Sequence, residues 1–156
     1  MKLRSLFALA VVASTLAAST SYALDVTGTW AGKEKCAFFT GTAFSDKYDV
    51  TISITQTGTD LNFNLAGGFL AGNWNGVAVA DIDDPIAGQV GLHPCSSSLN
   101  FGEAGAFVVK TDPTDGSGKL KGRITYISHS IEEGVTVCKF SVKRTNVANP
   151  AVAACP

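Results

Sequence analysis

Residues 47–65, the stretch that decides the fold, read KYDVTISITQTGTDLNFNL. Between residues 48 and 55 apolar and polar side chains alternate one by one, and the alternation returns from Leu61 to Leu65. A period of two is typical of a β-strand with one face on a core and the other in water. Residues 57–60, which lie between the two runs, read TGTD and favour a turn. This stretch therefore predicts a β-hairpin.

The same alternation continues along the chain, whereas no stretch after residue 23 repeats apolar side chains with a helical period. We expect eight strands, over residues 28–36, 47–56, 61–65, 71–81, 87–93, 105–111, 119–129 and 135–145. A flat sheet of this size would leave two open edges and an exposed apolar face, and closure into a barrel removes both. We therefore predict an all-β fold, a single up-and-down antiparallel β-barrel of about eight strands. A two-sheet β-sandwich is the alternative.

Residues 1–23 have the pattern of a secretory signal peptide. Two basic residues open the chain, residues 6–16 are uncharged and apolar, and small side chains at Ser21 and Ala23 stand where a signal peptidase cuts. The apolar run is shorter than the ~20 residues of a membrane span. We expect cleavage near Ala23 and no membrane insertion afterwards. The β-barrel domain, residues 24–156, is then secreted or periplasmic.

The mature part of the chain carries little net charge. Two of the 12 basic residues belong to the signal peptide, which leaves 10 against 13 acidic residues and a net charge of −3. The basic residues are scattered along the sequence. We therefore expect no nucleic acid as a partner, and the sequence alone gives no argument for binding to an anionic membrane.

The four cysteines, Cys36, Cys95, Cys138 and Cys155, all follow the signal peptide. An even count in an exported chain indicates two disulfides. Cys36 ends the first expected strand and Cys138 begins the eighth, so a closed antiparallel barrel places both at the same end. We favour Cys36–Cys138 with Cys95–Cys155, although the sequence leaves all three pairings open. No C-x-x-C pair occurs and there are two histidines, so we expect no metal ion and no cofactor.

The stretch Gly28-Thr29-Trp30 opens the first expected strand, and Arg144 lies late in the last one, on the same face as Phe140. With these features the chain resembles the calycin superfamily of lipocalins, fatty-acid-binding proteins and avidins. In lipocalins a Gly-x-Trp begins the first strand, its Trp packs across the closed end of the barrel, and an Arg of the last strand covers the ring. The resemblance implies that Trp30 and Arg144 form a structural lid through a cation–π contact.

The residues around these motifs limit what the resemblance implies about ligands. Avidins place Asn and Ser soon after their Gly-Thr-Trp to bind biotin, whereas residues 31–34 of this chain read AGKE. The run Cys138-Lys139-Phe140 and the ending Cys155-Pro156 are similar to those of small exported bacterial proteins of uncharacterised activity. That likeness implies no particular reaction.

Acidic and histidine residues offer few candidates for chemistry. Asp81, Asp83 and Asp84 suit calcium as ligands, but they form a turn-like run before a proline and lack EF-hand spacing. His93 and His129 fall on expected strands that are not neighbours, and the chain has no Gly-x-Ser-x-Gly motif. We therefore expect no catalytic residue and no enzyme.

The inward face of the expected barrel supplies the tentative ligand-binding residues. They are Tyr48, Ile52, Phe63, Phe107, Ile124, Tyr126 and Phe140. An eight-stranded barrel either fills with its own side chains or holds one small ligand, and glycines within the strands leave that choice open. We expect a secreted, non-catalytic protein that binds a small apolar ligand inside the barrel.

A protein-interaction or inhibitor module of the cell envelope, with an extracytoplasmic protein as its partner, is the alternative function. Two long loops are expected, over residues 36–46 and 95–103. They carry four phenylalanines, Phe38, Phe39, Phe44 and Phe101. Exposed aromatic side chains mark binding patches, so this alternative places binding at the loops.

Overall fold

The computed structural model describes residues 24–40, 42–84, 86–95, 101–128 and 134–155, and within these it leaves out the side chains of residues 39, 40, 42–45, 101–103 and 128. The signal peptide expected over residues 1–23 therefore lies outside the described part, as does His129. The described residues include no helix with the length and apolarity that crossing a membrane requires.

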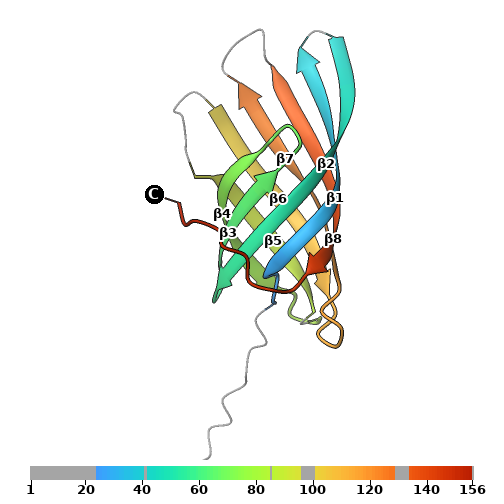
Figure 1. Ribbon diagram of the computed structural model, residues 1–156. Helices are drawn as coiled ribbons and strands as arrows, with labels where there is room; N and C mark the ends of the chain where they lie inside the picture. Colours follow the sequence, from blue (N-terminus) through green and yellow to red (C-terminus); the bar gives the residue numbers. More distant parts are fainter. Residues whose placement is uncertain (1–23, 41, 85, 96–100, 129–133, 156) are drawn as a thin grey trace, which may run out of the picture.

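Eight antiparallel strands close into one barrel (Figure 1). They are β1 (Gly28–Thr40), β2 (Thr42–Thr57), β3 (Asp60–Ala66), β4 (Gly72–Ala80), β5 (Ala87–Pro94), β6 (Phe101–Thr111), β7 (Gly118–Ser128) and β8 (Val135–Asn146). Each strand pairs with the next, and β1 also pairs with β8. The prediction of an all-β, up-and-down closed barrel is confirmed, and the β-sandwich alternative is wrong.

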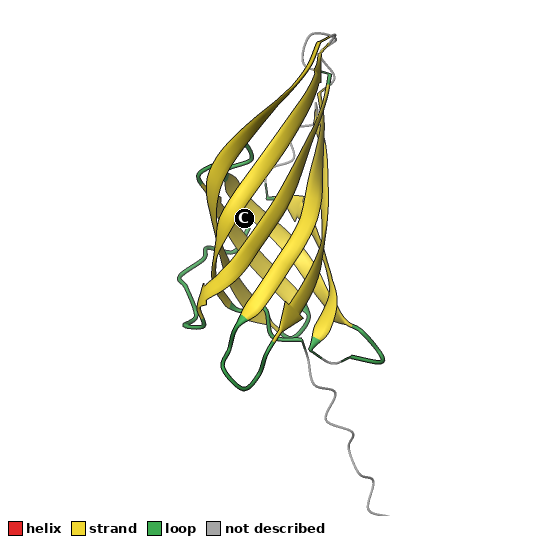
Figure 2. Ribbon diagram, turned by 90° about the vertical axis from the view of Figure 1, so that its right-hand side faces the viewer, coloured by secondary structure: helices red, strands yellow, loops and turns green. Residues whose placement is uncertain are grey.

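Strand pairing extends into both of the expected loops. β1 and β2 stay paired as far as Thr40 and Thr42, so residues 36–40 and 42–46 belong to a long hairpin instead of an open loop. β6 likewise begins at Phe101 and pairs with Ser128. β1 also pairs with β8 as far as Phe39, so these strand ends are part of the barrel wall. Backbone pairing there continues past the last clear apolar alternation, which is why the alternation alone does not locate these strand ends. Figure 2 shows the long strands converging at one end of the barrel.

The alternation seen in the sequence sorts the side chains between the core and the surface. The largest fully buried side chains include Trp30, Ile52, Ile54, Leu61, Phe63, Leu120 and Ile124. Along β8 the positions Cys138, Phe140 and Val142 are buried, while Lys139, Ser141 and Lys143 are exposed. A one-residue slip in pairing would reverse these two sets, so the burial pattern fixes the register.

Trp30 and Arg144 close the end of the barrel at which β1 begins and β8 ends. Trp30 is 0% exposed, and its Nε1 donates a hydrogen bond of 3.0 Å to the carbonyl of Val26. The Arg144 guanidinium carbon lies 4.8 Å from the centre of the Trp30 ring. Arg144 Nη1 also donates to the carbonyl of Gly116 at 3.2 Å, and Nη2 donates to the carbonyl of Asp25. These bonds hold the guanidinium over the indole ring.

Both disulfides form as expected, Cys36–Cys138 and Cys95–Cys155. Cys36 lies directly opposite Cys138, so the first bond crosses the β1–β8 seam inside the barrel, where both residues are 0% exposed. The second bond ties the C-terminal tail to the end of β5 (Figure 1). Disulfides persist in oxidising compartments, so the pair indicates an extracytoplasmic environment.

Candidate functional site

The barrel interior is packed along the side chains expected to bind a ligand. Ile52, Phe63, Phe107, Ile124 and Phe140 are each 3% exposed or less. The lining of a hollow cavity of ligand size would be exposed to water, whereas these side chains are almost completely buried. The rings of Phe107 and Phe140 instead lie 5.5 Å apart and fill the space between β6 and β8. Tyr48 and Tyr126 are partly buried and pack against this core.

Glycines within the strands make room for neighbouring side chains. A Cβ at Gly76 would lie 2.7 Å from Cε2 of Phe63, and one at Gly122 would lie 2.7 Å from Cδ1 of Phe107. The space that these glycines open is therefore occupied by aromatic rings. Of the two readings that the sequence left open, these contacts correspond to a filled core.

Glu34 is a functional candidate that the sequence reasoning missed. Its side chain is 0% exposed inside the barrel, and its Oε2 accepts a hydrogen bond of 2.8 Å from the backbone N–H of Phe69. Desolvation raises the pKa of Glu34, although backbone N–H groups of Phe69 and Leu70 act in the opposite direction. Alternation already places residue 34 on the inward face with Trp30, and this signal was hidden because lysines flank it on both sides.

The connection between β3 and β4 folds onto Glu34. Gly67 and Gly68 adopt φ values of 72° and 76°, a region that favours glycine, and they turn the chain so that the N–H of Phe69 reaches the carboxylate. The ring of Phe69 meets Phe38 edge-on at 4.8 Å and Tyr126 at 6.5 Å. Residues 67–70 therefore cover the Glu34 carboxylate at this end of the barrel interior.

The remaining candidate residues make contacts that stabilise the fold. Asp81 and Asp84 accept hydrogen bonds from the backbone N–H groups of Asp83 and Ile86, which makes them part of an ordinary turn. Glu34 Oε lies within 4.8 Å of the sulfurs of Cys36 and Cys138, but both sulfurs are in the disulfide. Thiolate is the form of cysteine that binds metals, so this trio is not a metal site in the oxidised protein.

The aromatic residues of the expected loops do not form an exposed cluster in the described part of the chain. Phe38 is 8% exposed and packs on Phe69, while the side chains of Phe39, Phe44 and Phe101 lie outside the description. The expected loop patch is therefore wrong for Phe38 and stays a prediction for the other three.

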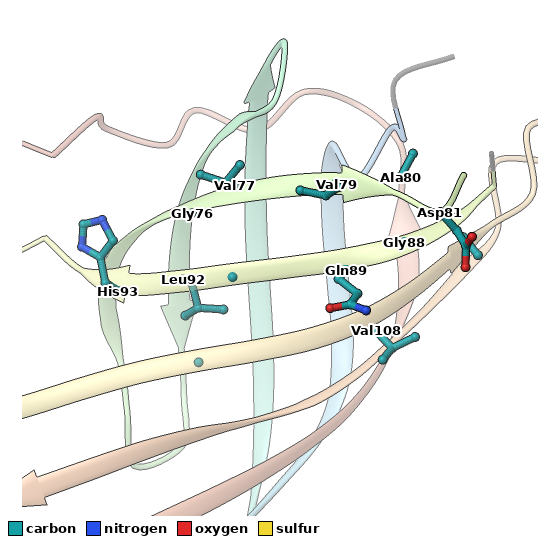
Figure 3. Close-up of a pocket in the computed structure, with 13 residues that line it drawn as sticks. Gly76, Val77, Val79, Ala80, Asp81, Gly88, Gln89, Leu92, His93 and Val108 are labelled. Carbon is teal, nitrogen blue, oxygen red and sulfur yellow. The ribbon is translucent and has the colours of Figure 1, made fainter. Parts of the chain in front are cut away.

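A groove of about 840 Å³ lies on the outer face of β4, β5 and β6. Figure 3 shows Val77 and Val79 on β4, Gln89 and His93 on β5 and Val108 on β6 around it. The three valines are 48%, 61% and 64% exposed. At the middle of β5 a Cβ on Gly91 would meet no atom within 4 Å. The groove is thus an open, mainly apolar hollow with two polar side chains along β5.

The sequence placed most of these groove residues on strands but did not single them out. Outward valines on a strand are common, and the open space at Gly91 lies between Val77 on one side and Ala106 on the other. That combination of small side chains depends on the register. His93, a candidate from the sequence, lies exposed at the end of this groove, with Nδ1 3.2 Å from the carbonyl of Pro94.

No protein-family model matches the chain, and no curated protein matches its sequence.

Proposed function

We propose that this protein is a non-catalytic, extracytoplasmic binding protein that takes a small apolar ligand in the groove on the outer face of β4–β6. The observation that carries the proposal is the contrast between the two faces of the wall. The inward side chains Phe63, Phe107 and Phe140 are packed, whereas Gly91 leaves open space on the outside. Secretion through residues 1–23 and kinship with the calycin superfamily are part of this proposal.

The size and lining of the groove support a small molecule as the occupant. Small-molecule sites span about 300–1,000 Å³ and are mostly apolar with a few polar groups, and a volume of about 840 Å³ falls within this range. Val77, Val79 and Val108 supply the apolar part. Gln89 and His93 supply hydrogen-bonding groups at intervals along β5.

The test is binding of an uncharged fluorescent probe, N-phenyl-1-naphthylamine, to the purified disulfide-bonded protein. In a Gly91→Val variant the added side chain enters the hollow without meeting another atom within 4 Å at its Cβ, so we expect intact folding and a loss of probe binding of at least tenfold. Ser141→Val, on the exposed face of β8, is the matched control and should bind as the unmodified protein does. Equal binding by all three proteins would rule the groove out.

A further inference from the structure

The fold gathers basic residues that are scattered along the sequence. β8 lies between β1 and β7, and β7 lies between β8 and β6. Lys139 on β8 is directly opposite Lys35 on β1 and directly opposite Arg123 on β7. These three residues form one row of positive charge across three neighbouring strands, and the exposed Lys47 of β2, opposite Lys35, continues the row at its edge.

Two further rows run parallel to the first. Lys143 on β8 is opposite Lys119 on β7, and Lys119 is opposite Lys110 on β6. Between these rows, Lys33 of β1 and Lys121 of β7 both pair with Ser141. All eight basic residues are exposed, and together they define what we call the basic face: Lys33, Lys35, Lys110, Lys119, Lys121, Arg123, Lys139 and Lys143.

Few carboxylates neutralise the basic face. Lys33 pairs with Asp49 at 2.7 Å and Lys110 with Asp84 at 3.5 Å, both at its edges. The other six basic residues have no carboxylate within 4 Å among the described residues. The side chains that share the outward face with them, such as Ala31, Val108 and Ser141, are uncharged. Like charges directly opposite each other destabilise a sheet, so this arrangement has a cost to folding that a partner would offset.

The basic face is also compact. Neighbouring strands lie about 4.8 Å apart and a step of two residues covers about 6.8 Å, so four strands and three rows span about 14 by 14 Å. This is little more than one Debye length of about 8–10 Å at physiological salt. The charges therefore act together on a nearby anionic surface, although the mature chain as a whole has a net charge of −3.

We propose that the basic face docks on the surface of an anionic phospholipid membrane. Seven of its eight cations are lysines, which are compact charges on flexible stems, whereas arginine is the residue of choice for fixed phosphate and nucleic-acid contacts. The eight charges are spread over a wall of exposed strands, which matches an array of mobile headgroups better than one bound phosphate. The disulfides put the protein in a compartment that membranes border.

The test is co-sedimentation of the purified protein with vesicles. We expect binding to vesicles of equimolar phosphatidylcholine and phosphatidylglycerol, none to phosphatidylcholine alone, and a loss of binding at high salt. Each lysine near an anionic surface strengthens binding by about fivefold, so a triple variant, K119Q, K121Q and K139Q, should bind about 100-fold more weakly. Circular dichroism and the mass of the disulfide-bonded protein check that it folds.

A matched control lowers the net charge equally but elsewhere. In T57E, T59E and N73D the changes lie at the end of β2, in the β2–β3 turn and on β4. Thr57, Thr59 and Asn73 are exposed and none of them pairs with a residue of the basic face. We expect this control to keep most of the binding, and an equal loss in both triple variants would overturn the proposal. Binding to heparin or duplex DNA without binding to anionic vesicles would also overturn it. Uptake of the neutral probe by the groove should not change in either triple variant, so failure of the two proposals can be told apart.

Discussion

Oε2 of Glu34 accepts a hydrogen bond of 2.8 Å from the backbone N–H of Phe69 at a depth where the carboxylate has no contact with solvent. This pair links the wall of the barrel to the β3–β4 connection that plugs it. A buried carboxylate resists ionisation, and desolvation accordingly raises the pKa of Glu34 above its ordinary value of 4.5.

A raised pKa in the folded state predicts how Glu34 affects stability with pH. The folded protein holds the proton more tightly than the unfolded chain does, so the stability contributed by protonated Glu34 is fully present below the unfolded pKa and is lost as pH rises through the folded one. The neutral variant Glu34→Gln should therefore gain in stability relative to the unmodified protein as pH rises above about 4.5. Urea denaturation across this pH range measures the difference.

Asp115 provides a control for the Glu34 experiment, because its pKa shifts the other way. A hydrogen bond from the backbone N–H of Ser117 lowers the pKa of this exposed carboxylate. The stability that ionised Asp115 contributes is lost as pH falls. The free energy of unfolding of Asp115→Asn should therefore differ most from that of the unmodified protein at neutral pH and least in acid. If the stability of Glu34→Gln relative to the unmodified protein fell with rising pH, as expected for Asp115→Asn, the hydrogen bonds to Glu34 would outweigh its desolvation.

Replacing Arg144 should destabilise the closed end of the barrel. Arg144→Met removes the contact with Trp30 and the hydrogen bonds to the carbonyls of Gly116 and Asp25. We expect a loss of about 2–4 kcal/mol in the free energy of unfolding. Lys143→Met, one position earlier and exposed, should change it by less than about 0.5 kcal/mol. Comparable losses of stability in both variants would show that the contacts of Arg144 with Trp30, Gly116 and Asp25 do not stabilise the fold.

Removing each of the two disulfides should affect a different part of the structure. Chain entropy predicts a loss of about 4.7 kcal/mol on removing Cys36–Cys138 and about 4.3 kcal/mol on removing Cys95–Cys155, from sequence separations of 102 and 60. Replacing Cys36 and Cys138 by Ala also leaves space in the core. Replacing Cys95 and Cys155 by Ala frees the tail and leaves the barrel wall unchanged. Amide exchange of β1 and β8 should therefore accelerate more in the first double variant, and the reverse order would contradict this account.

Two glycines on neighbouring strands offer a direct test of the packing. Gly76→Ala would place its Cβ 2.7 Å from Phe63 and should cost about 1–3 kcal/mol in the free energy of unfolding. Gly91→Ala meets no atom within 4 Å and should be neutral or stabilise by up to about 1 kcal/mol. Thermal unfolding of the pair measures the contrast. A tolerated Gly76→Ala would indicate spare volume inside the barrel.

The fold was predictable because the alternation of apolar and polar side chains identifies each strand locally, and the number of strands then favours a closed barrel. Positions 48–54 and 138–142 carry this alternation so clearly that strand number and closure follow, and closure sets which cysteines meet. The strand ends near Thr40 and Phe101 were missed, since backbone pairing continues there into residues whose apolar and polar side chains do not alternate.

The candidate sites were harder to predict, because each depends on residues brought together by register. The groove needs Gly91 between Val77 and Ala106. The basic face needs Lys139 beside both Lys35 and Arg123. In the sequence these residues are scattered. The pairing of β5 with β4 and β6 assembles the groove, and the pairing of β8 with β1 and β7 assembles the basic face.

The central claim is that the ligand binds on the outside of a filled barrel, and amide chemical shifts during a titration with N-phenyl-1-naphthylamine test it most directly. We predict that the amides of Val77, Gln89, Gly91 and Val108 shift together and saturate at one affinity, while those of Ile52 and Ile124 stay in place. Saturable shifts centred on Ile52 and Ile124, with none at Gly91, would contradict the account and place the ligand inside.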